Sequence, residues 1–134
     1  MSLAQLAPLT GVVIVTTPHN VAANIAGKSV QLFRRLNAPI LGVVENMGAF
    51  VDPETGKETR IFSGMSGEDL ASELQIPYLG SVPMDPGVSM AGDQGVPAVV
   101  AYPASRQADG FRSIAGKLAQ QASIMALGRE TVTA

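Results

Sequence analysis

Two runs of apolar residues frame an amphipathic segment in the first third of the chain. Gly11–Thr17 and Ile40–Glu45 are rich in β-branched residues, a pattern typical of strands buried on both faces of a parallel sheet. Between them, Val21–Leu36 carries apolar residues at helical spacing and predicts a helix capped by Asn20. The face predicted to be buried consists of Val21, Ile25, Leu32, Phe33 and Leu36. Strand, helix and strand together predict a right-handed βαβ unit.

After the βαβ unit the chain first breaks the alternation of strand and helix and then resumes it. Polar, Gly-containing sequence between Phe50 and Phe62 predicts a hairpin, and Pro77–Pro83 predicts a third strand. The other predicted elements are a helix at Ser66–Leu74 capped by Ser66, a turn or short helix at Asp85–Ala91, an extended Pro97–Pro103 and a helix at Ser105–Leu127. The last helix is predicted to bury Ala108, Phe111, Ile114, Ala115, Leu118, Ala122 and Met125.

These elements predict an α/β fold built on a partial, doubly wound parallel sheet. Three core strands are few for such a sheet, and the first of them begins near residue 11 with nothing before it to cover it. We therefore expect residues 11–127 to be the C-terminal part of a larger domain. Residues 1–10 are expected to be a leader or added residues, and residues 128–134 a tail. The uncovered apolar sheet edge or helix face predicts self-association.

Composition removes several classes of function. Charged residues make up 15% of the 134 residues, against a usual share of about 25%, and the net charge is −2. The chain therefore lacks the excess of positive charge with which proteins bind the phosphates of nucleic acids. The chain contains no cysteine, which excludes disulfides and thiolate-held metal within it. No apolar stretch reaches the length of a membrane span, and no basic residues precede an apolar run at the start, so a cytoplasmic protein without a membrane partner is expected.

Polar residues stand where each predicted strand ends. Thr16 and Thr17 end the first strand, the polar pair Glu45 and Asn46 ends the second, and Asp85 follows the third. Ligands of open α/β sheets bind at the carboxyl ends of the strands, so this edge is the candidate binding edge. The sequence Ala26–Ser29, AGKS, does not predict a phosphate-binding loop, because the first glycine of that motif is replaced by Ala22 and the segment lies inside a predicted helix.

Taken together, the sequence resembles the C-terminal half of the Mrp family. Its members, also called ApbC or Nbp-type proteins, are MinD-like P-loop ATPases that bind and carry iron–sulfur clusters. The resemblance covers roughly Gly11 to Leu118 and rests on VTTP, GVVENM, IPYLGSVPMDP and GDQGVP. It implies a P-loop NTPase sheet whose N-terminal strands and Walker A motif are missing from this chain.

The resemblance also implies a set of nucleotide-binding residues. In related ATPases an Asn after the second of these strands contacts adenine, and a Pro-x-Asp after the third lines the base pocket. Mapped by motif, these are Asn46 and the pair Pro83 and Asp85. Thr16 and Thr17 follow as weaker candidates near the nucleotide. An Asn amide can both donate to and accept from the adenine edge.

One departure from the family concerns the iron–sulfur cluster. Many members carry a Cys-x-x-Cys after Phe50, whereas this chain has the turn Asp52–Lys57, DPETGK, whose role the sequence does not assign. Carboxylates and Lys are poor ligands for a cluster that uses thiolates, so a cluster is not expected on this chain.

Two functions remain open. The first is the C-terminal part of an Mrp-like, ATP-binding protein of iron–sulfur cluster assembly, which supplies the adenine side of the site. ATP and Mg²⁺ would then bind only with a complementing N-terminal half, and the chain alone would not hydrolyse ATP. The alternative is a non-enzymatic interaction module that kept the fold and lost the chemistry, and that pairs with itself or with a full-length Mrp-like protein.

Overall fold

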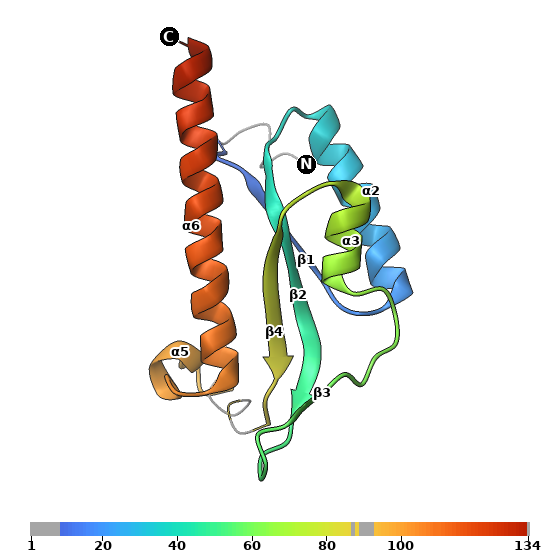
Figure 1. The fold of residues 1–134 in the computed structure, drawn as a ribbon, viewed down its shortest axis with the longest axis vertical. Coiled ribbons are helices and arrows are strands. Elements are labelled where there is room, and N and C mark those ends of the chain that lie inside the picture. The colour runs from blue at the N-terminus through green and yellow to red at the C-terminus, as the bar shows by residue number, and fades with distance from the viewer. Residues whose placement is uncertain (1–8, 87, 89–92, 134) are drawn as a thin grey trace.

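The computed structural model describes residues 9–86, 88 and 93–133, and within them it has an α/β fold. The strands are β1 (Val12–Thr16), β2 (Ile40–Val51), β3 (Glu58–Thr59) and β4 (Tyr78–Met84). The helices are α2 (Asn20–Arg35), α3 (Gly67–Leu74), α5 (Ala98–Ala101) and α6 (Arg106–Thr133). In Figure 1 the strands form a central layer, with α2 and α3 on one face and α6 on the other.

The parallel sheet that the sequence predicts is confirmed, with one antiparallel addition. β2 is central and pairs in parallel with β1 on one side and with β4 on the other. β3 pairs antiparallel with the end of β2, through Phe50 and Val51, and forms the predicted hairpin. β2 is longer than predicted because it continues past Glu45 into this hairpin. In the described part of the chain, β1 has a strand neighbour on one side only.

The layer between the sheet and the α2–α3 pair forms one half of the core. Its buried members are Ile14, Ala23, Ala26, Val30, Val43, Leu70 and Ala71. The predicted buried face of α2 is therefore wrong in part: Val21, Ile25 and Leu32 are exposed, while the small residues Ala23 and Ala26 face the sheet. Alanines allow the helix to lie close against the strands, a packing reason that hydrophobicity alone does not reveal.

The predicted N-cap of α2 is also wrong. His19 is the N-cap residue and makes no side-chain cap, while the Asn20 side-chain oxygen accepts a hydrogen bond from the Met65 amide at 3.1 Å. The cap of α3 is confirmed, since Ser66 Oγ accepts from the Asp69 amide. Asn20 thus ties α2 to the segment that leads into α3.

The layer between the sheet and α6 is the other half of the core. Val44, Leu79, Val82 and Ile114 are its buried members, with Val13 and Leu118 packed against them. Gly110 lets α6 approach β4 closely, because an added Cβ would lie 2.9 Å from the Ser81 carbonyl oxygen. The predicted burial of Phe111 and Ala115 is wrong, as both are exposed. The helix continues to Thr133, and Figure 1 shows its C-terminal end extending beyond the sheet.

Two further predictions need correction. Val15 of β1 is 64% exposed, so β1 is not buried on both faces: α6 lies over β4 and β2 and does not cover this residue. Pro97–Pro103 is not wholly extended, because it contains the short helix α5. The predicted turn at Asp85–Ala91 lies partly outside the described residues. Among the described helices, none combines the length and apolar character that spanning a bilayer requires.

Candidate functional site

The prediction that the strands end together is wrong in part: β1 ends at Thr16, whereas β2 continues to Val51, so Asn46 lies within β2. In the pairing register Thr16 of β1 lies opposite Glu45 of β2, and Asn46 lies opposite Val82 of β4. Neighbouring strands are about 4.8 Å apart, so Thr16, Asn46 and the residue after Val82 fall within a short distance of one another. The parallel pairing of the three strands produces this convergence.

Three of the five predicted site residues line a single cavity. Thr16, Thr17 and Asn46 border a cavity of about 440 Å³ beside β1. Its other lining residues come from β1 and from α2, and include Ala22, Ile25, Ser29 and Phe33. Thr16 is buried and its hydroxyl donates to the Thr17 carbonyl at 3.3 Å, whereas Asn46 is exposed. The cavity therefore has an apolar body and a polar end, the usual composition of a small-molecule site.

The other two predicted residues lie apart from this cavity. Pro83 is buried and lines a different cavity, of about 310 Å³, between β4 and α6. Its carbonyl oxygen accepts a hydrogen bond from the Gln107 side chain at 3.2 Å. Asp85 is half-buried and borders neither cavity. The structure thus brings Thr16, Thr17 and Asn46 together and does not place Pro83 and Asp85 with them.

The connection between β1 and α2 is braced beside the cavity. Thr17 Oγ1 and His19 Nδ1 form a 2.8 Å hydrogen bond, and the His19 ring lies 4.3 Å, centroid to centroid, from the Phe62 ring. The Gly64 amide donates to the Pro18 carbonyl at 3.1 Å. His19 therefore fixes a loop through contacts within the protein.

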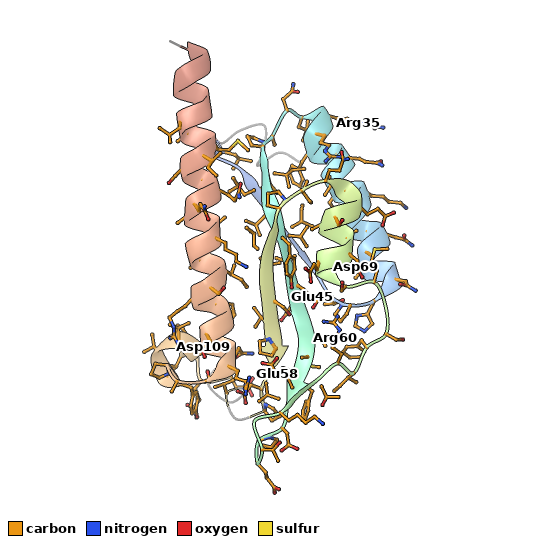
Figure 2. All side chains as sticks on the ribbon, viewed as in Figure 1. Arg35, Glu45, Glu58, Arg60, Asp69 and Asp109 are labelled. Atoms are coloured by element: carbon orange, nitrogen blue, oxygen red, sulfur yellow. The ribbon has the colours of Figure 1, made fainter. Side chains whose placement is uncertain are left out.

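Glu45, which the sequence singles out together with Asn46, is the centre of a cluster whose other members the sequence does not predict. The Glu45 side chain is 1% exposed and accepts four hydrogen bonds. Arg60 donates to both carboxylate oxygens (3.2 and 3.3 Å), the Gly67 amide donates at 2.6 Å, and the Ser81 hydroxyl donates at 3.2 Å. Figure 2 shows Glu45 between the strands and α3, with Arg60 approaching from the loop after β3. A carboxylate in an otherwise apolar strand was the available signal.

This cluster changes the electrostatics of its neighbours. The hydrogen bond to Glu45 raises the pKa of the Arg60 guanidinium above its usual value. Burial, followed by the negative charge of Glu45, raises the pKa of the Tyr78 hydroxyl. Both pKa shifts keep Arg60 charged and Tyr78 neutral up to a higher pH.

The turn at Asp52–Lys57 is an ordinary charged hairpin tip. Asp52 Oδ1 accepts from the amides of Glu54 (2.8 Å) and Thr55 (3.3 Å), and the Asp52 amide donates to the Lys57 carbonyl. The hairpin is tied to α6 by an exposed ion pair of 3.4 Å between Glu58 and Arg106. Within the described residues, no three His, Cys, Asp or Glu side chains gather as a metal site.

Comparison with known proteins identifies the family. A family model described as ParA, NUBPL iron-transfer P-loop NTPase matches residues 1–119. The chain belongs to this family. An iron–sulfur cluster carrier protein of Deinococcus radiodurans is 44% identical over 127 residues, which are 95% of this chain and 36% of that protein. The chain thus spans little more than a third of the length of this curated relative.

Solved structures agree with the fold. The cell-division ATPase MinD of Pyrococcus furiosus superposes with a TM-score of 0.64 at 22% identity, over 81% of this chain and 41% of that one. A nucleotide-binding protein of Archaeoglobus fulgidus in complex with ADP superposes with a TM-score of 0.56 at 30% identity, over 64% of this chain and 35% of that one. The resemblance to Mrp-type, MinD-like P-loop NTPases is confirmed, as is the partial α/β sheet of that type.

Proposed function

We propose that this member of the iron-transfer P-loop NTPase family supplies the adenine side of a nucleotide site in an iron–sulfur cluster carrier. The observation that carries the proposal is the cavity that Thr16, Thr17 and Asn46 share at the edge of the sheet where β1 reaches its carboxyl end. That edge is where ligands of such sheets bind. The family, whose members include iron–sulfur cluster carrier proteins, supports the same proposal.

Asn46 has the chemistry to recognise adenine. Its exposed amide offers an acceptor and two donors, which complement the amino group and ring nitrogens of the base. The apolar walls from β1 and α2 would hold the flat ring system, and the Thr17 hydroxyl stands at the polar end of the cavity. Pro83 and Asp85 lie apart from this cavity, so the proposed contacts with the base do not include them.

The phosphate side of the site is not built from the residues described here. Gly27, Lys28 and Ser29 lie inside α2, where their amides are engaged in helix hydrogen bonds and cannot surround a phosphate. The phosphates and Mg²⁺ of ATP would therefore be held only when another polypeptide segment brings the phosphate-binding loop, and this chain alone would bind nucleotides weakly, through the base, and would not hydrolyse ATP. The hairpin lacks thiolates, so it does not fit an iron–sulfur cluster.

The test is a comparison of nucleotide affinities. Isothermal titration of the chain with ADP and GDP should give measurable binding with preference for ADP, and Asn46→Ala should weaken ADP binding by about 5- to 150-fold. Asn24→Ala is the matched control, because Asn24 is exposed on α2 and lies outside the cavity. Equal affinity for ADP and GDP, or no binding by the unmodified chain, would contradict the proposal.

A second candidate function is an interaction module, and the open edge of β1 favours it. Val15, Val21 and Ile25 are exposed on β1 and on the adjoining α2, beside a strand edge that lacks a partner in the described structure. Such an edge pairs readily with a further strand. We propose that it receives a second copy of this chain or the phosphate-binding part of a relative, within the reducing environment of the cytoplasm.

Light scattering at high micromolar concentration tests this second function. The chain should be larger than a monomer, and Val15→Lys should shift it to a monomer, because a buried lysine would oppose edge pairing. Lys added at an exposed position on the far side, Ser123→Lys on α6, is the control and should leave the mass unchanged. A monomeric unmodified chain would contradict self-association.

A further inference from the structure

Glu45 is the one acidic residue buried in the described core, and the proposed recognition of adenine does not use it. A buried carboxylate costs free energy unless hydrogen bonds and an opposite charge compensate it, and an apolar residue at the same place often gives equal stability. Here each carboxylate oxygen accepts two hydrogen bonds, from donors on three separate segments. The arrangement therefore specifies the positions of those segments relative to β2.

The backbone immediately after Glu45 is the part that carries Asn46. Asn46 Oδ1 accepts from the Met47 amide at 3.0 Å, and Met47 has a positive φ of 58°, so the chain kinks there. Gly48 then lies directly on the cluster, because an added Cβ would be 1.9 Å from Ser81 Oγ and 2.5 Å from Glu45 Oε1. The kink that presents Asn46 is thus fixed on one side by Glu45 and supported on the other by Gly48.

Arg60 links the same carboxylate to the hairpin. It follows β3 directly, its side chain is 49% exposed, and its two terminal nitrogens each contact one oxygen of Glu45. The Gly67 amide at the start of α3 completes the connection. One side chain therefore joins the part of β2 that carries Asn46 to the segment between residues 52 and 67.

We propose that Glu45 and Arg60 form a positioning pair, which holds Asn46 in the orientation that selects adenine. Through this pair, binding of the base at Asn46 also stabilises the hairpin. This inference rests on the proposed nucleotide site and deepens it. It assigns to the pair a role in base selectivity: Glu45 and Arg60 do not touch the base, and they act through the backbone of residues 46–48.

The test measures base selectivity as the ratio of GDP to ADP dissociation constants. Glu45→Gln keeps the shape of the side chain and removes its charge, and Arg60→Gln removes the partner from the exposed side, where folding is least affected. Each variant should lower the ratio by about 2- to 30-fold, the range expected for a residue that acts through its neighbours. A purely structural role would lower the unfolding midpoint and leave the ratio unchanged. Arg106→Gln is the matched control, since it removes the other ion pair of the hairpin and leaves Glu45 untouched.

Amide hydrogen exchange gives a second readout. ADP should slow exchange in residues 52–67 of the unmodified chain, and this protection should be lost in Arg60→Gln and kept in Arg106→Gln. If the unmodified chain prefers ADP, if Asn46→Ala abolishes the preference, and if both pair variants retain the ratio and the protection, the positioning role is overturned and the nucleotide site stands. If the unmodified chain shows no preference, both proposals fail together.

Discussion

The inner part of the sheet and its β1 edge are held in different ways. Around Glu45, hydrogen bonds join β2, β4, α3 and the loop after β3, and the carboxylate is almost fully buried. Along β1, one strand neighbour is present in the described structure and Val15 remains exposed. The proposed adenine site draws Asn46 from the fixed region and Thr16 and Thr17 from the open one. A rigid recognition group beside an open edge suits a site that a further segment completes.

The largest contrast between the two regions should appear in stability. Val43 and Val15 are valines on neighbouring parallel strands, one fully buried and the other 64% exposed. Val43→Ala should lower the free energy of unfolding by about 2 to 3 kcal/mol through lost burial and a cavity. Val15→Ala should change it by less than about 0.5 kcal/mol. Urea unfolding followed by circular dichroism measures both, and equal losses would remove the contrast.

A smaller effect is expected at the hydroxyl that contacts Glu45. Ser81→Ala removes a donor from a buried carboxylate and should cost about 1.5 to 3 kcal/mol, the usual range for a hydrogen bond to a charged group. Ser113→Ala removes an exposed hydroxyl of α6 and should leave stability nearly unchanged. The same urea titration applies, and a neutral Ser81→Ala would mean that the cluster does not depend on this donor.

The smallest effect is a pH dependence that Tyr78 introduces near the cluster. Burial and the charge of Glu45 raise its pKa in the folded chain above the ordinary value of 10.0. The unfolded chain therefore loses this proton first as pH rises. The stabilising contribution of the neutral hydroxyl is present below the ordinary pKa and is lost as pH climbs through the raised one. Unfolding free energies between about pH 8 and pH 11 should fall less steeply for Tyr78→Phe than for the unmodified chain. Tyr102→Phe, at an exposed position, should follow the unmodified chain, and identical slopes for all three would contradict the assignment.

The regular elements could be predicted because their signals are local. The β-branched runs of β1 and of the first half of β2 favour strands over helices. The Ser66 cap is predicted by the Asp69 that follows three residues later. The sequence does not predict the buried face of α2 correctly, because Val21 and Ile25 are as apolar as core residues; they are exposed beside the open edge of β1.

The Glu45 cluster lay beyond sequence reasoning for a different reason. Its donors are 15, 22 and 36 residues away along the chain, so no spacing rule connects them. The convergence of Thr16, Thr17 and Asn46 could be predicted because the first two strands run parallel, although β2 continues past Asn46. Pro83 lines a different cavity from Asn46 because α6 packs against β4. The order of strands along the sequence does not predict this packing.

Asn46 and its neighbours are proposed to receive an adenine base. The most direct measurement is a titration of the isotopically labelled chain with ADP, followed by nuclear magnetic resonance of its backbone amides. Shifts should concentrate at Thr16, Thr17 and Asn46, with weaker changes reaching Arg60, and GDP should give no comparable response. Shifts scattered over α6, or an equal response to both nucleotides, would contradict the proposal.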